Sequence, residues 1–338
     1  MKAAVYKGKH QFVVDEIPIP SPGPGEVLVK VRYSAICGTD VHEYLYDATP
    51  VGAILGHEYS GTIAQIGPEV TLWKKGDRVM GGGGEPPPGI SHPLRQHPRY
   101  NFREMAVSQR SMRSYAEFVI NKDWQIMPIP EGVTDQQAAL CEPAAVAVRA
   151  IRKSALKPGD KVAILGAGPI GLFCIQVAKA AGATEVYVTE PSSARSQAAI
   201  AVGANAVVNP MVDDPVTKIV EYTNGIGPEI VFECASAKST LSQAFNMTKR
   251  EGQVVLVALA WEPTSITPIE WMGREISLAS SFGTSHSDWS IALDLIKAGK
   301  IDMGAMITDS SFIKLEQVQK AFEDLIKPSS QLQMIIEP

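Results

Sequence analysis

Three short segments of the sequence carry side chains of the kinds that bind metal ions. They contain Cys37, the pair His57-Glu58 and the pair Cys141-Glu142. Thiolate, imidazole and carboxylate donors together form a borderline-soft ligand set that suits Zn²⁺. A single buried cysteine, however, is usually only a small apolar residue. Because the segments lie far apart in the chain, spacing alone does not establish a metal site.

A glycine-rich segment predicts a phosphate-binding turn. The apolar run Lys161–Leu165 leads into Gly166-Ala167-Gly168-Pro169-Ile170-Gly171, which has the spacing G-x-G-x-x-G. The first glycine permits the tight turn, the second lets the backbone approach a pyrophosphate, and the third lets helix and strand pack closely. The N-terminus of the following helix then faces the anion. A strand before the turn and a helix after it make the pattern specific for a dinucleotide site.

Glu190 ends the next expected strand and is the candidate reader of the cofactor's ribose. A carboxylate there accepts hydrogen bonds from both ribose hydroxyls of NAD and repels the extra phosphate of NADP. Arg195 lies five residues further on and is the alternative, because a guanidinium could bind a 2′-phosphate. We favour NAD, with Arg195 near the adenine. Further cofactor contacts are expected at Ala235, Ala258, Leu259, Ser281 and Phe282.

The elements that must carry these groups follow from hydrophobic patterning. From residue 133 onward, strand and helix patterns alternate, which predicts a doubly wound parallel sheet. Expected strands are 161–165, 185–189, 206–208, 229–233, 253–260 and 275–281, and expected helices are 136–153, 170–181, 194–202, 215–223, 239–247, 288–297 and 315–327. Before residue 133, short strands at 1–6, 27–33, 59–67 and 77–80 are separated by Gly and Pro, which indicates a small barrel-like β domain.

Composition excludes several classes of function. The chain has 338 residues, 45% of them hydrophobic and 20% charged, with a net charge of −5. These values are ordinary for a globular protein and give no sign of a nucleic-acid binder. The longest uncharged stretch, 162–178, contains three glycines and is too short for a membrane span. Four widely spaced cysteines fit a reducing compartment, so we expect a cytoplasmic protein without a disulfide framework.

The order of these motifs resembles that of the zinc-dependent medium-chain dehydrogenases. The motifs are Cys37-Gly-Thr-Asp, Gly56-His-Glu, Glu142-Pro and the glycine-rich turn, and the likeness is strongest to the polyol branch, with its sorbitol, 2,3-butanediol and threonine dehydrogenases. The resemblance covers nearly the whole chain. It implies a GroES-like catalytic domain over 1–146, to which 284–338 returns, and a Rossmann NAD-binding domain over 147–283.

The resemblance also implies roles for single residues. Cys37 and His57 would be zinc ligands, and Glu58 would be a third ligand or a carboxylate that binds the zinc only part of the time. Glu142 would be a fourth ligand that binds directly or through a water. Cys141 competes with Glu142 by adjacency, but the Glu-Pro match favours Glu142.

Three residues beside Cys37 would assist catalysis in such an enzyme. Asp40 would orient His57, Thr39 would hydrogen-bond the substrate hydroxyl, and His42 would end a proton relay towards solvent. The implied reaction is the reversible oxidation of a secondary alcohol. A zinc-bound alkoxide would form through the relay and would transfer a hydride to NAD in the cleft between the domains.

The region Gly81–Arg113 departs from the family pattern. Many relatives hold a second, structural zinc with four cysteines in this lobe, but here the lobe has no cysteine, so we expect one zinc per chain. The lobe instead carries a run of arginines, namely Arg95, Arg99, Arg103, Arg110 and Arg113. These indicate either a solvated loop or subunit contact, or a positive rim for an anionic alcohol. The pocket residues of known polyol dehydrogenases are not matched around Phe282, so the substrate stays open among polyols, cyclitols and sugar alcohols.

Two other functional classes compete with a zinc-dependent dehydrogenase. A zinc-free quinone or enoyl reductase on the same scaffold would lack the Cys-Gly-x-Asp and Gly-His-Glu segments. A non-enzymatic NAD-binding protein would have no use for a complete ligand set. The expected partners are a small alcohol and further copies of the chain, as a homotetramer or as a homodimer paired near 275–281, with no nucleic acid or membrane.

Overall fold

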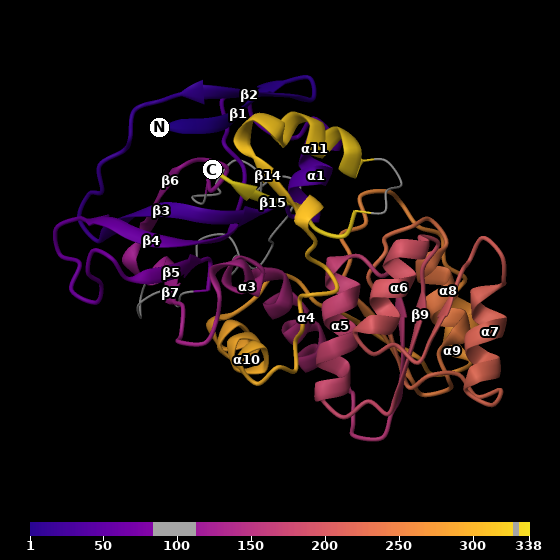
Figure 1. Ribbon diagram of the computed structural model, residues 1–338. Coiled ribbons are helices and arrows are strands. Elements are labelled where there is room, and N and C mark those ends of the chain that lie inside the picture. Colours follow the sequence, from indigo (N-terminus) through magenta and orange to yellow (C-terminus); the bar gives the residue numbers. More distant parts are fainter. Residues whose placement is uncertain (84–112, 327–330) are drawn as a thin grey trace. The chain divides into compact units, whose positions relative to one another are not determined.

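The computed structural model describes residues 1–83, 113–326 and 331–338, which form two units. The first unit comprises Met1–Glu142, Thr308–Ser329 and Gln333–Pro338, and the second comprises Pro143–Ile307 and Ser330–Leu332. Figure 1 shows strands predominating in the first unit and alternating strands and helices in the second. The expected combination of a β-rich domain with a Rossmann-type domain is therefore confirmed.

Two sheets build the first unit. A two-stranded sheet pairs β1 with β2, and a seven-stranded sheet has the order β14-β15-β3-β4-β5-β7, with β6 also paired to β3. Strand bounds are β1 Lys2–Gly8, β2 Gln11–Glu16, β3 Glu26–Ala35, β4 Glu58–Ile66, β5 Arg78–Gly81, β6 Phe118–Lys122, β7 Ile126–Pro128, β14 Phe312–Lys314 and β15 Ile335–Glu337. The central pair, β3 and β4, packs valine, isoleucine and tyrosine side chains into one buried cluster. This buried core fixes β4, whose first residue is Glu58, one of the three candidate metal ligands.

Short helices complete the first unit. They are α1 Gly38–Leu45, α3 Asp135–Ala139, α11 Val318–Leu325 and 3-10 turns at Asp123–Gln125, Asp309–Ser311 and Leu315–Gln317. The expected single helix over 136–153 is wrong, because α3 ends at Ala139 and α4 begins at Cys141 and runs to Lys153. Pro143 explains the break, since it has no N–H to bond the carbonyl four residues earlier. The helix α1 was not expected from the sequence, although it carries Thr39, Asp40 and His42.

A six-stranded parallel sheet forms the centre of the second unit. Its order is β10-β9-β8-β11-β12-β13, with bounds β8 Lys161–Leu165, β9 Glu185–Thr189, β10 Ala206–Val208, β11 Ile230–Glu233, β12 Gln253–Leu256 and β13 Ser277–Ser280. β12 ends four residues before the expected boundary: Val257 N makes the last bond of the ladder, to the Glu233 carbonyl, and Ala258 N donates to the same carbonyl instead of continuing the pattern. The strand order reverses between β8 and β11, and ligands bind at the carboxyl ends of the strands at such a reversal.

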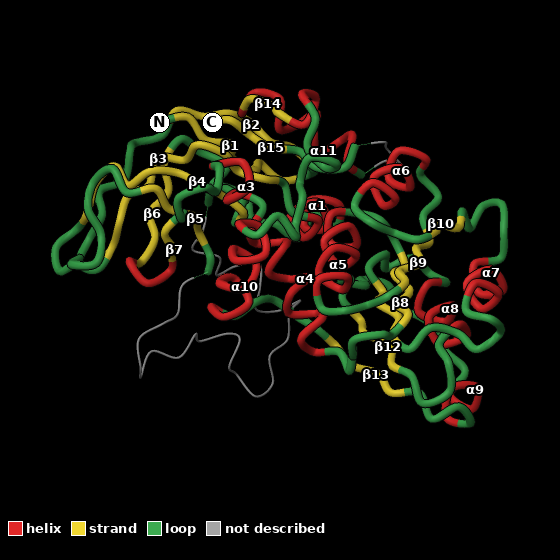
Figure 2. Tube along the Cα trace, turned by 60° about the horizontal axis from the view of Figure 1, so that its bottom comes forward, coloured by secondary structure: helices red, strands yellow, loops and turns green. Residues whose placement is uncertain are grey.

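Helices cover this sheet in two pairs. The bounds are α5 Pro169–Ala180, α6 Ser193–Ala201, α7 Pro215–Tyr222, α8 Thr240–Met247, α9 Pro268–Met272 and α10 His286–Lys297. α5 contacts α6, and α7 contacts α8. Because crossovers between parallel strands are right-handed and the chain leaves the centre in opposite directions, the two pairs lie on opposite faces. Figure 2 shows α5 on one side of β8 and β9 and α8 on the other side.

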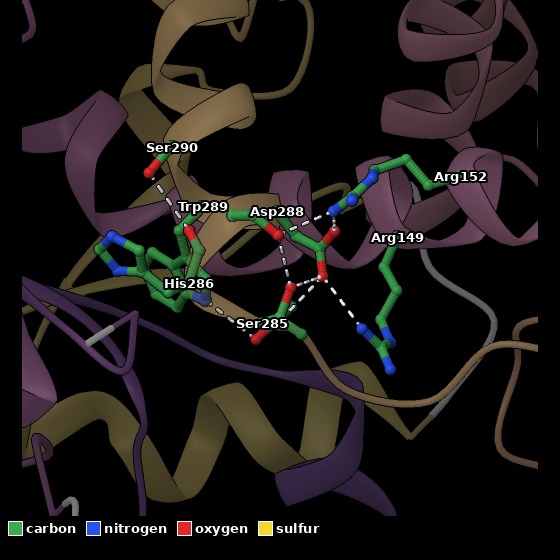
Figure 3. Close-up of polar contacts among 9 residues, drawn as sticks. Arg149, Arg152, Ser285, His286, Asp288, Trp289 and Ser290 are labelled. Atoms are coloured by element: carbon green, nitrogen blue, oxygen red, sulfur yellow. Dashed lines mark hydrogen bonds and ion pairs between the residues drawn. The ribbon is translucent and has the colours of Figure 1, made fainter. Parts of the chain in front are cut away.

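An ion-pair network joins α10 to α4. Asp288 accepts from two arginines of α4, from Arg149 Nη1 at 3.2 Å and from Arg152 Nη1 at 2.5 Å (Figure 3). It also accepts from Ser285, the N-cap of α10, whose backbone N–H donates at 2.8 Å and whose hydroxyl donates at 2.6 Å. Asp288 is almost fully buried. Through these contacts residues 284–307 lie with the second unit, whereas the sequence-based boundaries assigned them to the first.

Candidate metal centre and dinucleotide site

Three of the expected ligands converge in the first unit. One potential ligand atom of each of Cys37, His57 and Glu58 lies within 4.8 Å of the others. Cys37 caps the N-terminus of α1, where its sulfur accepts from Thr39 N at 3.4 Å, and Glu58 is the first residue of β4. Gly56 sets the position of His57, because its φ is +99° and an added Cβ would meet the Tyr115 ring at 2.6 Å. The chain path thus brings together residues that are twenty positions apart.

Asp40 and Tyr115 continue this cluster outward. Asp40 Oδ1 lies 3.5 Å from His57 Nδ1, and the Tyr115 hydroxyl donates to Asp40 Oδ2 at 2.7 Å. Both Asp40 and Tyr115 are fully buried. Because Nδ1 of the imidazole faces Asp40, Nε2 is the nitrogen left to bind a metal. The orienting role expected for Asp40 stays a prediction.

The electrostatics of the cluster favour a bound cation. Burial, and next to it the Glu58 carboxylate, raises the pKa of the Cys37 thiol to about 11. Burial, followed by the Glu142 carboxylate, also raises the pKa of Glu58. Within the described residues, Glu58 Oε2 is buried without a hydrogen-bond partner. Acidic groups that share a buried space are uncompensated without a cation, and a Cys, His and Glu donor set matches zinc, so these residues fit that ion.

Glu142 and Cys141 differ in their relation to this cluster. The Glu142 carboxylate raises the pKa of both Cys37 and Glu58, which places its charge near the two side chains. Cys141 is fully buried, and burial raises the pKa of its thiol far above the usual range. Neither residue belongs to the group of three that converges among the described residues. Glu142 therefore remains the better candidate for a fourth position.

Thr39 and His42 lie on the first turns of α1. The Cys37 thiol lies 3.4 Å from Thr39 Oγ1, so the hydroxyl is next to the ligand group. His42 Nδ1 lies 2.7 Å from the Gly38 carbonyl oxygen, which accepts only from an N–H. Nδ1 therefore carries the hydrogen of the neutral ring, and Nε2 is its basic nitrogen. Both side chains are partly exposed, as a relay towards solvent requires.

The glycine-rich turn has the geometry that the sequence predicts. Gly166 has φ +91°, and an added Cβ would lie 2.9 Å from the Ala235 Cβ, while a Cβ on Gly171 would lie 2.0 Å from the Gly166 carbonyl oxygen. Gly168 is the N-cap of α5, with Pro169 at the first helical position and open space around the Gly168 Cα. Amide groups at a helix N-terminus bind anions. The turn is thus built for a close approach of phosphate.

Glu190 and Arg195 lie next to this turn. Glu190 Oε2 accepts from Ala167 N at 2.8 Å, and Oε1 accepts from Ser192 N at 2.9 Å. The carboxylate is 4% exposed, and each oxygen retains a lone pair for a further donor. Arg195 Nη2 donates to the Gln331 carbonyl at 3.4 Å. The carboxylate thus tightens the turn as well as standing where the ribose is expected.

The remaining candidates lie at the ends of β11, β12 and β13. Ala235 follows β11 and packs against Gly166, and Ala258 and Leu259 follow β12 and are partly exposed. Ser281 is 6% exposed, and its hydroxyl has no hydrogen-bond partner within the described chain. Phe282 is 39% exposed. The parallel sheet therefore places all five residues at the carboxyl ends of its strands, where the glycine-rich turn also lies.

Sequence analysis missed Glu233, the last residue of β11. Its Oε1 accepts from Ala235 N at 3.0 Å, from Ser236 N at 2.8 Å and from the Thr240 hydroxyl at 2.8 Å. Tyr115 was not identified from the sequence either. An acidic residue at the carboxyl end of a strand next to the reversal point is the signal that could have identified Glu233.

Several expectations fall outside the described residues. Arg95, Arg99, Arg103 and Arg110 lie there, so a positive rim and the absence of a structural zinc stay predictions. The four cysteines are free thiols. Within the described part of the chain, every helix is too short or too polar to cross a membrane.

Comparisons with known proteins agree with this geometry. A family model described as an alcohol dehydrogenase GroES-like domain matches residues 23–131, and one described as a zinc-binding dehydrogenase matches residues 169–298. The chain is 32% identical to (R,R)-butanediol dehydrogenase of Bacillus subtilis over 356 residues, with 100% of both chains covered. It is 30% identical to sorbitol dehydrogenase of Homo sapiens over 333 residues, covering 96% of this chain and 92% of the relative.

Solved structures show the same likeness. The crystal structure of 2R,3R-butanediol dehydrogenase from Bacillus subtilis superposes with a TM-score of 0.87 at 31% identity, over 100% of this chain and 99% of that one. A protein described as a zinc-binding dehydrogenase from Sinorhizobium meliloti 1021, bound to NADP, superposes with a TM-score of 0.86 at 29% identity, over 100% and 99% of the two chains.

Proposed function

The chain belongs to the zinc-dependent medium-chain dehydrogenases, and from this premise we propose that it reversibly oxidises a secondary alcohol to a ketone with NAD as the hydride acceptor. Dehydrogenase activity of the zinc type follows from the family. The substrate, the residue roles and the preference for NAD are parts of the proposal. The observation that carries it is the convergence of Cys37, His57 and Glu58 around a buried carboxylate oxygen without a partner among the described residues.

Cys37, His57 and Glu58 would hold the zinc ion, with Glu142 at the fourth position directly or through a water. When bound, zinc supplies a Lewis acid that lowers the pKa of the substrate hydroxyl. Thr39, next to the Cys37 sulfur, would accept the hydrogen bond of that hydroxyl. His42 would take up the proton at Nε2, because Nδ1 is directed at the Gly38 carbonyl. Asp40 would keep His57 in the orientation that the metal needs.

NAD is favoured over NADP by the fixed carboxylate of Glu190. Its two backbone contacts hold it beside the glycine-rich turn, where a 2′-phosphate would meet a buried negative charge. The relative from Sinorhizobium meliloti that is bound to NADP supports the alternative, in which Arg195 takes the phosphate. Measuring both cofactors decides between them.

The substrate that we propose is a small polyol or diol. Sorbitol and butanediol dehydrogenases are the named relatives, and both alcohols carry hydroxyl groups on neighbouring carbons. A second hydroxyl next to the reacting one offers an extra ligand or hydrogen bond at the site. A screen with NAD should therefore compare vicinal diols and sugar alcohols with simple secondary alcohols of equal size.

The decisive experiment is the zinc content of the purified protein, measured by elemental analysis without added metal. About one zinc per chain, lost together with alcohol oxidation in Cys37→Ser while NAD binding is kept, supports the proposal. If the purified protein contains no zinc, and zinc cannot be restored by adding the metal, the result would favour a quinone or enoyl reductase, or a non-enzymatic NAD-binding protein. Retained activity in Cys37→Ser would refute the ligand assignment.

We also propose that two chains pair along β13, as a dimer or within a tetramer. β13 is the edge strand of the parallel sheet in the described residues, so one side of its backbone is available to another strand. Leu278 on this strand is 46% exposed, and Ile269 and Met272 of the adjacent α9 are 72% and 63% exposed. Exposed apolar residues beside an unpaired edge favour association.

A further inference from the structure

We propose that Tyr115 is a positioning residue of the metal centre, which holds Asp40 so that Asp40 can orient His57. The proposal rests on the proposed function, because it concerns the same zinc site. Its basis is a continuous chain of contacts. The Tyr115 hydroxyl donates to Asp40 Oδ2 at 2.7 Å, and Asp40 Oδ1 lies 3.5 Å from His57 Nδ1.

Burial makes this chain of contacts significant. Tyr115 and Asp40 are both fully buried, so water has no access to replace the phenol. A buried carboxylate that loses one of its hydrogen-bond donors is left partly uncompensated, which is costly. Such a carboxylate would turn or take up a proton, and in both cases its contact with the imidazole would change. The basicity and the direction of the ligating nitrogen depend on that contact.

The backbone around Tyr115 couples it to the metal-binding segment directly. Tyr115 N donates to the Leu55 carbonyl at 3.0 Å, and Ser114 N donates to the Gly56 carbonyl at 3.2 Å. The segment that contains Tyr115 is also held on its other side, because Ala4 N donates to the Tyr115 carbonyl at 2.9 Å. The Tyr115 ring lies against Gly56, which precedes His57. The Tyr115 phenol and the His57 imidazole therefore belong to two backbone segments that are hydrogen-bonded to each other, so a shift of one segment also moves the other.

The electrostatic surroundings keep the phenol a donor. Burial, followed by the carboxylate of Asp40, raises the pKa of Tyr115 well above its usual range, and Glu58 and Cys37 contribute to this rise. A tyrosine in such surroundings stays neutral and keeps its proton. It stabilises the Asp40 carboxylate without adding a charge that would compete with the metal.

The test is Tyr115→Phe, with Tyr44→Phe as the matched control. Tyr44 is buried in the same apolar cluster, packs against the same Phe322 ring, and donates its hydroxyl to a backbone carbonyl, that of His10, at 2.7 Å. Both variants lose one hydroxyl from the same core. Zinc affinity is measured by competition with a chromogenic chelator on protein without NAD or substrate, and thermal unfolding of the zinc-free protein is recorded beside it.

We expect Tyr115→Phe to weaken zinc binding about tenfold, in the lower range for groups that support a metal ligand. Tyr44→Phe should stay within about twofold of the unchanged protein, since general weakening of the core does not act on the metal. A zinc affinity of Tyr115→Phe within twofold of the unchanged protein, or an equal loss in Tyr44→Phe, overturns the proposal. If the unchanged protein binds no zinc, the proposed function fails instead, which is a different result.

A double-mutant cycle tests whether Tyr115 acts through Asp40. Asp40→Asn alone should weaken zinc binding, and adding Tyr115→Phe to the Asp40→Asn background should weaken it by less than about twofold more. Independent, multiplying losses would mean that Tyr115 acts on the metal centre by another route, and would refute the positioning role. The cycle also covers the case in which Tyr115→Phe lowers stability, because both backgrounds would share that loss.

Discussion

Replacing Glu190 tests two properties at once: the stability that its contacts with backbone amides provide, and the preference for NAD over NADP. Both carboxylate oxygens accept from backbone amides, at 2.8 Å from Ala167 N and 2.9 Å from Ser192 N, and the side chain is 4% exposed. Glu190→Ala removes both acceptors and leaves two amides with little access to water. Glu190→Gln keeps one acceptor oxygen but turns an NH₂ group towards the other amide. The two variants should therefore differ in degree.

The magnitude follows from the two lost contacts. An orphaned buried amide costs about 1–3 kcal/mol, and water entering the space left by the side chain reduces this. We expect Glu190→Ala to lower the free energy of unfolding by about 2–4 kcal/mol, and Glu190→Gln by about half as much. At roughly 2–4 °C per kcal/mol for a chain of this size class, Glu190→Ala should unfold about 5–15 °C earlier.

Cofactor binding gives the second magnitude. Loss of the hydrogen bonds that ribose hydroxyls donate to a carboxylate costs about 1.5–3 kcal/mol, which corresponds to roughly a 10- to 100-fold weaker Kd for NAD. NADP should lose much less, because the variant no longer sets a negative charge against the 2′-phosphate. The assay is titration of each nucleotide by calorimetry, with thermal unfolding measured on the same samples without nucleotide.

Either readout can refute the reasoning. Unfolding of Glu190→Ala within about 2 °C of the unchanged protein would mean that the two amide contacts contribute little. Equal weakening of NAD and NADP would mean that another group reads the ribose, and a gain for NADP with no loss for NAD would favour the Arg195 alternative. Because stability and selectivity are recorded separately, a damaged turn cannot be mistaken for a lost ribose contact.

Three further predictions concern the second unit. Glu233→Ala should weaken NAD binding about tenfold by releasing Ala235 and Ser236. Glu229→Ala, just before the opposite end of β11, should leave the Kd for NAD unchanged in the same titration. Asp288→Asn should lower the free energy of unfolding by about 1–3 kcal/mol, a reduced cost because the Arg152 side chain is 49% exposed. Burial alone would raise the pKa of Asp288, but hydrogen bonds from Ser285 and the arginines lower it, so its contribution is complete at neutral pH and is lost as the pH falls through that lowered value. Urea unfolding at pH 7 and near pH 3 should therefore show the gap between Asp288→Asn and the unchanged protein closing in acid, and a constant gap would contradict the pKa direction. Leu278→Pro should give smaller particles by light scattering after gel filtration, and an unchanged mass would exclude pairing along β13.

The sequence predicted the second unit almost element by element, for a physical reason. Its inner strands, such as β8, are buried on both faces and alternate with helices such as α5, so apolar runs and helical periodicity mark both clearly. The errors lie at boundaries that tertiary hydrogen bonds decide. β12 ends where two amides turn to the Glu233 carbonyl, and α3 and α4 separate before a proline inside an alanine-rich stretch. Pro143 was visible in the sequence as a sign of the second boundary, whereas nothing in the local pattern marked the end of β12.

The first unit was predicted less completely, because its elements are short and depend on distant partners. α1 is eight residues long, and β15 pairs with strands far away in the sequence. Short helices of this kind have weak intrinsic stability and form mainly through packing, which a single sequence does not display. Thr39, Asp40 and His42 of α1 could nevertheless be selected, because the motif that contains them indicates a chemical role even though the helix itself was not predicted.

The same contrast separates the metal ligands from the groups that hold them. Cys37, His57 and Glu58 could be selected because the order of their motifs resembles that of the zinc-dependent medium-chain dehydrogenases, and the structure brings the three together. Tyr115 and Glu233 could not, since a buried tyrosine and a glutamate at a strand end each have many ordinary structural roles. Only the distances, 2.7 Å to Asp40 in one case and 2.8–3.0 Å to three donors in the other, distinguish them. If the Tyr115→Phe cycle succeeds, the selection of supporting residues in this family should start from hydrogen-bond paths leading outward from the ligands, because residue type alone does not identify them.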